Sequence, residues 1–327
     1  MASSTDEIVR AASLLRTGGV VAFPTETVYG LGADATNREA VRRLFAIKGR
    51  PTDHPLIVHL GAMDWLGQWA CDIPVAARLL AETFWPGPLT LVLPRQPWVP
   101  DAVTGGQDSV ALRMPEHPMA LQLVAASGAL AAPSANRFGH VSPTTAQHVR
   151  DELGFMVDMI LDGGPCRIGV ESTIVSLLDG RPVLLRPGGL SIEILESTLN
   201  QKVLLAPSAV HKVRVPGMLV SHYSPVTPLE VHPVDALWRL ARQSARHGLK
   251  VAVLQLSGNV ECCDGSGIAI FHMPARADEY GRVLYATLHC LDHVGLHILL
   301  AEAPPDIPEW MTVRDRLVRA ARNFHRE

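Results

Sequence analysis

The sequence predicts a two-domain α/β protein, with a larger mixed sheet first and a small, mostly parallel sheet after it. The length of 327 residues favours about two domains. Short apolar strands alternate irregularly with helices in the first two thirds of the chain and regularly near its end. Between these parts, residues 205–228 hold Pro207, Pro216, Pro225 and Pro228 with little periodicity, as is typical of a linker.

Composition excludes several classes of protein. Hydrophobic residues make up 47% and charged residues 19% of the chain, so it can bury a core and is not disordered. The net charge of −3 argues against a strongly basic nucleic-acid binder. The five cysteines form no CxxC pair, and adjacent Cys262 and Cys263 are more simply two thiols than a metal pair. Since no apolar run spans a bilayer, we expect a cytoplasmic protein with no membrane partner.

The first domain, residues 1–204, opens with a capping box at Ser4-Thr5-Asp6-Glu7 and a helix that ends at Gly18-Gly19. Asn37 caps a second helix, and residues 74–84 predict a third. Apolar runs predict the strands Val20–Phe23, Leu56–Leu60, Leu89–Leu93, Val110–Met114, Ala129–Ala132, Met159–Asp162, Thr173–Leu178 and Val183–Arg186.

After the linker, residues 229–327 alternate strand and helix regularly, which predicts a small Rossmann-like parallel α/β domain. The dinucleotide fingerprint GxGxxG is absent, as are the Walker loop and the HExxH and GxSxG motifs. The predicted elements are the strand Leu229–Val231, the helix Val234–Arg246, the strand Val251–Leu256, the helix Glu279–Leu291, the strand His297–Ala301 and the helix Val313–Phe324.

Polar side chains follow the first predicted strand directly. Residues 24–32, PTETVYGLG, supply hydroxyls, a carboxylate, a phenol and two glycines, which we expect to let the backbone turn. One helix later come Lys48 and Arg50, and Pro51 stops the helix. Cations at a helix carboxyl end complement its dipole without any ligand. Together with the hydroxyls, these two favour phosphate binding. Glu26 has no predicted role beyond a structural hydrogen bond.

Other segments also carry polar residues at strand ends. His59 is equally a core residue or a ligand, and Arg113 in its apolar strand needs a carboxylate from the protein or from a ligand. Ser142 before Pro143 is typical of a helix N-cap, which can also bind an anion. Polar clusters from several segments predict a site at one edge of the sheet.

The motifs PTETVYGLG, KGRP, HPLIVH, WPGPLTLVL, VALRMPEHP, APSAN, SPTTAQHV, GVESTIVSL and RPGG, in this order over residues 8–200, resemble the YrdC-like threonylcarbamoyl-AMP synthase family. PGMLVSHYSP, residues 216–225, resembles the linker of its long two-domain form. The resemblance implies a twisted mixed sheet with a concave cleft. It also implies a nucleotidyltransferase that converts L-threonine, bicarbonate or CO2 and ATP, with Mg²⁺, to L-threonylcarbamoyladenylate and pyrophosphate. Implied partners are a downstream threonylcarbamoyl transferase complex and tRNA, because the product serves tRNA threonylcarbamoyladenosine modification.

The resemblance further implies a role for matched side chains. Lys48 and Arg50 would be the catalytic cations, and the protein itself would hold no metal. Tyr223 of the linker would fold over the cleft as part of a lid, and His54 replaces the Asn of many members, which makes its ATP contact pH-sensitive. Threonine would contact Thr27, His59, Arg113, Ala132 and Ser172, with Thr25 close by, and the nucleotide would contact Arg50, His54, Ser109, Ser134, Asn136, Ser142, Arg186 and Tyr223.

Two other functions remain open at this point. One is a carbamoyl-adenylate-forming module that starts from carbamoyl phosphate on the same sheet. The other is an RNA-binding module that uses the concave face, although the net charge and 5% aromatics support it poorly. The basic last helix, with Arg314, Arg316, Arg319 and Arg322, could touch RNA, but a solvated helix face explains it as well.

Overall fold

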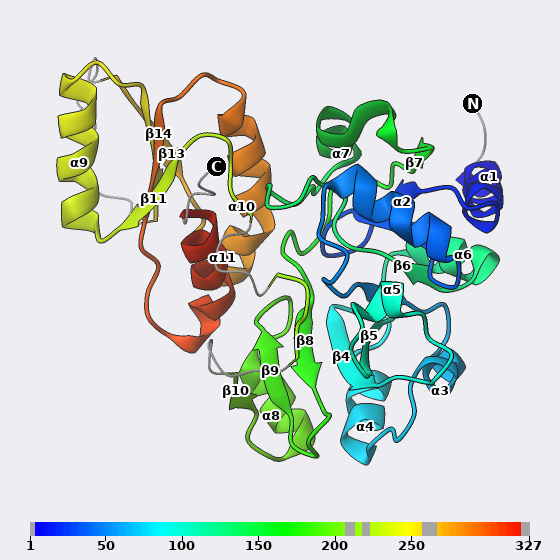
Figure 1. The fold of residues 1–327 in the computed structure, drawn as a ribbon. Helices are drawn as coiled ribbons and strands as arrows, with labels where there is room; N and C mark the ends of the chain where they lie inside the picture. The colour runs from blue at the N-terminus through cyan, green and yellow to red at the C-terminus, as the bar shows by residue number, and fades with distance from the viewer. Residues whose placement is uncertain (1–3, 207–212, 218–222, 257–266, 322–327) are drawn as a thin grey trace. The chain divides into compact units, whose positions relative to one another are not determined.

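The computed structural model describes residues 4–206, 213–217, 223–256 and 267–321 (Figure 1). Contacts divide the chain into two units, residues 1–138 with 142–218 and residues 139–141 with 219–327. The predicted boundaries at residues 204 and 228 stay a prediction, since much of the linker between them lies outside the described residues.

The larger unit is built on a ten-stranded mixed sheet, which confirms the predicted fold class. Its strand order is β10-β9-β8-β4-β5-β3-β6-β2-β1-β7, with parallel and antiparallel pairs (Figure 1). The strands are β1 (Val21–Phe23), β2 (Gly30–Asp34), β3 (Ile57–His59), β4 (Leu89–Pro94), β5 (Ser109–Arg113), β6 (Leu130–Ala131), β7 (Met159–Ile160), β8 (Thr173–Ser176), β9 (Val183–Arg186) and β10 (Leu204–Leu205).

Helices cover this sheet. The apolar stripe of the first helix packs with Phe23 and Leu123 into one core cluster, as its periodicity predicts. The helices are α1 (Ser4–Arg16), α2 (Arg38–Lys48), α3 (Leu66–Trp69), α4 (Val75–Phe84), α5 (Asp101–Thr104), α6 (Pro118–Ser127), α7 (Ala146–Leu153) and α8 (Ile192–Leu199), with the 3-10 turns Met63–Trp65 and Gly154–Met156.

Helix α2 positions the two candidate cations. The Asn37 side chain accepts hydrogen bonds from the backbone N–H groups of Glu39 and Ala40, which confirms the predicted cap. Gly49 ends the helix in the left-handed conformation, with φ 62°. Lys48 is therefore the last helical residue, and Arg50 lies just beyond the turn.

The prediction that residues 24–32 form a turn with two flexible glycines is wrong in part. Gly30 and Gly32 lie inside β2, which pairs antiparallel with β1. The Phe23 ring packs over both, and a Cβ on Gly32 would lie only 2.8 Å from the Phe23 Cε1 atom. The glycines provide space for an aromatic ring, so their spacing indicates packing in a strand rather than a turn.

The helix N-cap predicted at Ser142 is also displaced. Helix α7 begins after Thr145, whose side chain accepts from the backbone N–H of His148. Ser142 lies three residues earlier, and its hydroxyl donates to Glu171 instead.

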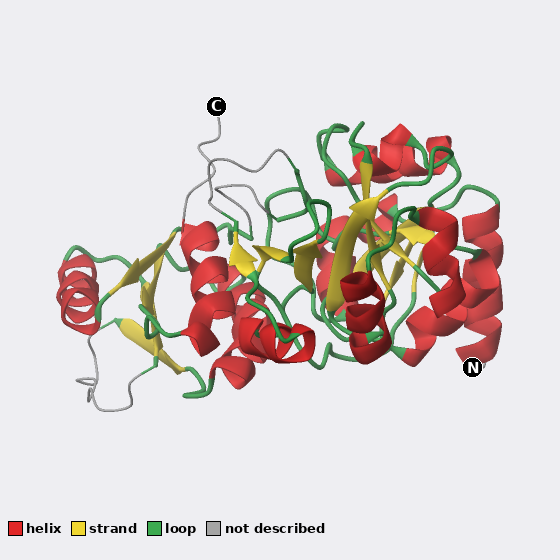
Figure 2. Ribbon diagram, turned by 90° about the horizontal axis from the view of Figure 1, so that it is seen from below, coloured by secondary structure: helices red, strands yellow, loops and turns green. Residues whose placement is uncertain are grey.

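The smaller unit has the predicted parallel α/β architecture. Its four strands are all parallel in the order β11-β14-β12-β13. Helix α9 covers one face, and α10 and α11 cover the other (Figures 1 and 2). The sequence does not predict β13, a strand with mostly half-exposed side chains. The elements are β11 (Leu229–His232), α9 (Val234–Arg246), β12 (Val251–Gln255), β13 (Ile268–His272), α10 (Ala277–Asp292), β14 (Ile298–Glu302), the 3-10 turn Pro308–Trp310 and α11 (Met311–Ala321).

Candidate active site

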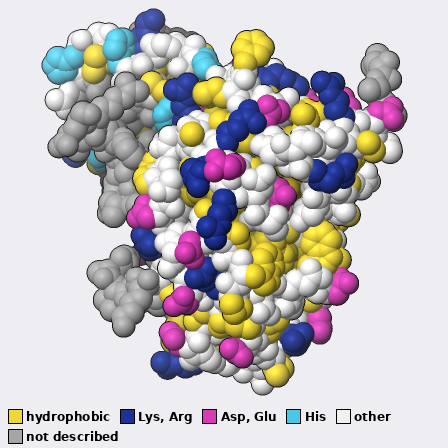
Figure 3. Space-filling model, turned by 45° about the vertical axis from the view of Figure 1, so that its right-hand side comes forward, with side chains coloured by type: hydrophobic (Ala, Val, Ile, Leu, Met, Phe, Trp, Pro, Cys, Tyr) yellow, Lys and Arg dark blue, Asp and Glu magenta, His cyan; other side chains and the backbone are white. Residues whose placement is uncertain are grey.

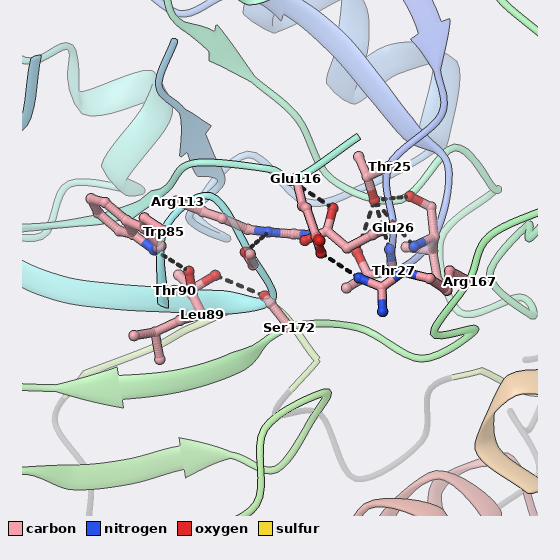
Figure 4. A network of polar contacts seen from close by, with 12 residues as sticks. Thr25, Glu26, Thr27, Trp85, Leu89, Thr90, Arg113, Glu116, Arg167 and Ser172 are labelled. Carbon is pink, nitrogen blue, oxygen red and sulfur yellow. Dashed lines mark hydrogen bonds and ion pairs between the residues drawn. The ribbon is translucent and has the colours of Figure 1, made fainter. Parts of the chain in front are cut away.

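A buried ion pair joins Glu26, on the segment after β1, to Arg113 at the end of β5 (Figure 4). Arg113 Nη2 donates to Glu26 Oε1 at 2.6 Å, and Arg113 Nε donates to the Gly87 carbonyl. The second Glu26 oxygen accepts from the backbone N–H of Glu116 at 3.1 Å. The Arg113 and Glu26 side chains are 5% and 3% exposed. Of the two partners expected for Arg113, the structure contains the internal carboxylate, and no hydrogen bond within the described residues uses Arg113 Nη1.

Thr25 and Thr27 flank that carboxylate with linked hydroxyls. Their Oγ1 atoms lie 2.8 Å apart, and Thr25 Oγ1 donates to the Val28 carbonyl and accepts from the Thr27 N–H. Such a turn fixes the direction of both side chains. The Thr27 hydroxyl is thus held beside Glu26, on the segment that carries Glu26 to Arg113 (Figure 4).

His59 lies at the end of β3, in register with Arg113 at the end of β5. Burial, assisted by the charge of Arg113, lowers the pKa of His59 to about 3. The imidazole is therefore neutral at physiological pH. Its ring lies edge-on to Phe23, and its Nδ1 atom is buried with no hydrogen-bond partner among the described residues.

A second polar group forms around Ser172, just before β8. Its hydroxyl lies 2.7 Å from Thr90 Oγ1, and Arg186 Nη2 donates to both its carbonyl and its hydroxyl. Arg186 Nη1 also donates to the Pro216 carbonyl. Ser142 joins this group, because its hydroxyl donates to Glu171, the neighbour of Ser172, at 2.7 Å.

A third group surrounds the two cations at the end of α2. The buried Lys48 ammonium donates to the backbone carbonyls of Ser134 and Asn136. Burial and then the charge of Arg50 lower the pKa of Lys48 well below its usual range. Arg50 donates to the Pro55 carbonyl at 2.9 Å.

The Phe138 ring joins Arg50 and His54. The Arg50 guanidinium carbon lies 5.7 Å from the centre of this ring, and His54 packs edge-on against it. Burial, followed by the charge of Arg50, lowers the pKa of His54. A neutral His54 is therefore favoured beside the cation.

Two of the three groups lie at one edge of the sheet, so the sequence-based expectation of a single edge is wrong only in part. Strand β8 is parallel to β4, β4 is antiparallel to β5, and β9 is antiparallel to β8, so the start of β8 and the end of β9 lie at the same edge as Arg113 and His59. The third group lies at the opposite edge, because Ser134 follows β6, which runs antiparallel to β3.

Strand β1 pairs antiparallel with β2, β2 with β6, and β6 with β3, so β1 runs opposite to β3 and β5. Its carboxyl end is therefore at the other edge from His59 and Arg113. The segment after β1 nevertheless brings Glu26 into contact with Arg113.

Two candidates of the larger unit take positions of a different kind. Ser109 begins β5, at the far end from Arg113, and no hydrogen bond among the described residues links its side chain to the other candidates. Ala132 is buried and donates its N–H to the Ile57 carbonyl, so only its backbone and methyl group are available to a ligand.

Tyr223 belongs to the smaller unit. Its ring is 1% exposed and packs against Tyr285, with the Arg316 guanidinium 5.1 Å from the ring centre. Its role toward a nucleotide stays a prediction, and residues 218–222 before it lie outside the described part of the chain.

Three residues of the site have no predicted role from the sequence. Thr90 lies inside an apolar strand, Glu171 lies inside a hydroxyl-rich segment, and Phe138 follows APSAN. The most useful overlooked signal is that a carboxylate in a buried loop and an arginine in a buried strand each need a partner of opposite charge.

The described residues contain no group of three or more His, Cys, Asp or Glu side chains that could hold a metal ion. On the face of the larger unit shown in Figure 3, Lys and Arg side chains lie among Asp and Glu side chains rather than in a continuous basic surface. Within the described ranges, every helix is too short or too polar to cross a membrane.

Comparison with known proteins places these features in a family. Residues 13–188 match the family described as "Telomere recombination", and residues 190–322 match "Threonylcarbamoyl-AMP synthase, C-terminal domain". The threonylcarbamoyl-AMP synthase of Pyrococcus abyssi is 42% identical over 95% of this chain and 93% of its own length. That of Bacillus subtilis is 39% identical over 98% of this chain and 94% of its own length.

The solved structures agree with the sequence relatives. The crystal structure of P. abyssi Sua5 complexed with L-threonine superposes with a TM-score of 0.89 and 40% identity, covering 98% of this chain and 95% of that one. Both domain matches and both full-length relatives lead to the same conclusion: the chain belongs to the threonylcarbamoyl-AMP synthase family, in its two-domain form.

Proposed function

We propose that this protein is an L-threonylcarbamoyladenylate synthase, a nucleotidyltransferase that makes L-threonylcarbamoyl-AMP and pyrophosphate from L-threonine, bicarbonate or CO2 and ATP. The product would pass to a threonylcarbamoyl transferase complex for tRNA modification. The observation that carries the proposal is the full-length likeness to the structure of P. abyssi Sua5 complexed with L-threonine. In this chain, the matching larger unit buries an arginine, a neutral imidazole and linked hydroxyls together.

These groups suit an amino acid with a hydroxyl side chain. Arg113 would bind the carboxylate through Nη1, since Nη2 and Nε already donate to Glu26 and Gly87. Buried hydroxyl and imidazole atoms reject an analogue that leaves them unpaired. The hydroxyl of Thr27 and the Nδ1 atom of His59 would supply this selection.

The chemistry needs orientation more than proton transfer. The substrate amine adds to CO2 and loses a proton to give a carbamate. A carbamate oxygen then bonds to the α-phosphorus, the bond to the β-phosphate oxygen breaks, and pyrophosphate leaves. The cations Lys48 and Arg50 would stabilise the charge that develops on the phosphate oxygens, in a site that excludes water.

Mg²⁺ would enter with ATP rather than occupy a site of the protein's own. The described residues offer no carboxylate cluster for it, whereas nucleotide phosphates commonly bind Mg²⁺ together with few protein ligands. When bound, Mg²⁺ neutralises phosphate charge. A cytoplasmic location stays a prediction.

Pyrophosphate release tests the proposal. The purified full-length protein is incubated with ATP and Mg²⁺ in three parallel reactions. The first contains threonine and bicarbonate, the second contains serine and bicarbonate, and the third contains carbamoyl phosphate alone. Threonine-dependent release supports the proposal. Release only with carbamoyl phosphate would overturn it in favour of a carbamoyl-adenylate-forming module.

Two variants test the cations. Lys48→Ala and Arg50→Ala are each expected to lose about 3 kcal/mol of transition-state stabilisation, roughly a hundredfold in rate. Arg38→Ala, at the exposed start of the same helix, serves as the matched control. Wild-type rates in both cation variants would contradict their assignment to the phosphates.

A further inference from the structure

Helix α9 of the smaller unit has one buried and one basic face. Leu237, Trp238 and Ala241 pack with residues of β12 and β14 in the core of this unit. The exposed side chains of the helix include three arginines, Arg239, Arg242 and Arg246. We call these three residues the α9 arginine row.

The spacing of the row aligns its charges. Separations of three and four residues place side chains on one face, about 4.5 and about 6 Å apart along the axis at a rise of about 1.5 Å per residue. Like charges at these separations destabilise a helix. The row therefore has a cost in the protein alone, and a polyanion would offset it.

The α9 arginine row lacks carboxylate partners within the described part of the chain. In contrast, on α11 Arg314 pairs with Asp306, and both Arg316 and Arg319 pair with Asp315. Since Arg316 is also fully buried, the last helix does not offer the basic face that its sequence suggests. Arg322 lies outside the described residues.

The row borders a hollow, which is lined by Val234, Asp235, Trp238, Arg239, Arg242, Gln243 and Arg246. Trp238 is 6% exposed, and its indole N–H is buried without a hydrogen-bond partner among the described residues. Asp235 is the one carboxylate among these lining residues. The hollow thus combines three guanidinium groups with one amide and one carboxylate.

We infer that the α9 arginine row binds the phosphodiester backbone of RNA. Guanidinium groups bind phosphate oxygens in a bidentate manner, and a row of three matches a strand of repeating phosphates better than one small anion. Arginine is also enriched at protein interfaces, so an acidic polypeptide is the competing ligand that the experiment below tests. The surface lies outside the proposed catalytic groups and does not depend on the adenylate chemistry.

The test measures binding of a fluorescent tRNA transcript to the full-length protein at several salt concentrations. Arg239→Gln/Arg242→Gln/Arg246→Gln is compared with a control, Arg10→Gln/Arg78→Gln/Arg181→Gln, which removes three exposed arginines from the larger unit. We expect the row variant to bind at least about tenfold more weakly, with the slope of log affinity against log salt reduced by about 2 to 3. The control variant should bind like wild type.

Threonine-dependent pyrophosphate release is measured on the same preparations and should be equal in all three proteins. If the wild-type protein showed no threonine-dependent pyrophosphate release, this would count against the proposed function but not against the RNA-binding inference. Equal tRNA affinity and salt slope in the row variant and wild type would overturn the inference. So would displacement of the tRNA by poly-L-glutamate at equal charge concentration, since that would identify an acidic polypeptide as the ligand.

Discussion

Breaking the pair between Glu26 and Arg113 should damage both stability and activity. Both side chains are nearly fully buried and lie 2.6 Å apart, so Glu26→Ala leaves a buried guanidinium without its counter-charge. Removing one partner of such a pair costs about 3–5 kcal/mol of unfolding free energy. Glu26→Gln keeps an oxygen that can accept from Arg113 but loses the acceptor for the Glu116 N–H, so it should cost less than Glu26→Ala.

Urea denaturation of Glu26→Ala, Arg113→Ala and the double variant measures the coupling. We expect the double variant to cost at least about 1 kcal/mol less than the two single losses combined, because no lone charge remains. Arg150→Ala, which breaks an exposed pair with Asp162, is the control and should change stability by at most about 1 kcal/mol. Single losses under about 1 kcal/mol that simply add would refute the buried-pair reasoning.

The same variants separate positioning from stability. Arg113→Ala should abolish saturation with threonine, because it removes the group that we propose binds the carboxylate. Glu26→Gln should raise KM for threonine severalfold and leave KM for ATP unchanged. A parallel rise in both KM values would show that the change disturbs the whole site, and Glu26 would then have no specific effect on Arg113.

Two further predictions concern His59 and Gly32. The folded-state pKa of His59, about 3, lies below its ordinary value of 6.5. Between these two pH values only the unfolded chain takes up a proton at this imidazole. The free energy of unfolding therefore falls as the pH falls below 6.5. Between about pH 6.5 and 5, urea denaturation should show wild type losing about 2 kcal/mol more than His59→Gln, and equal losses would exclude a buried neutral imidazole. Gly32→Ala should lower the unfolding free energy by about 1–3 kcal/mol, because its Cβ would meet Phe23. The control Gly67→Ala places a Cβ with nothing within 4 Å and should be nearly neutral. Thermal unfolding of both variants checks this prediction, and equal melting temperatures would refute it.

Periodicity predicts the elements that bury a continuous apolar face. The helix α1, the strands β4 and β5 and the alternation after residue 228 all appear within a few residues of their predicted bounds. The strand β2 escapes this reading because Gly30 and Gly32 have no side chains to show a period. Glycine is required at both positions because the Phe23 ring of the neighbouring strand packs over them. Local sequence does not show such contacts between strands.

The candidate site shows a similar division. The sequence correctly marks Arg113 as a buried cation that needs a carboxylate, but the partner is 87 residues away and only the fold joins them. Ser142 is marked by a local N-cap pattern, yet its hydroxyl binds Glu171 and Thr145 takes the cap. Local patterns thus identify which side chains are costly to bury, whereas the identity of each partner depends on strand order.

Two cations of the larger unit, Lys48 and Arg113, are held by protein acceptors that use only some of their donors. In its protonated form Lys48 has three N–H donors, and two of them reach the carbonyls of Ser134 and Asn136. Arg113 donates through Nη2 and Nε, which leaves Nη1. Carbonyl oxygens and one carboxylate therefore fix the direction of each cation during folding. In the proposed reaction these groups would not need to reorient when charge develops on the substrate, which is the condition for electrostatic catalysis.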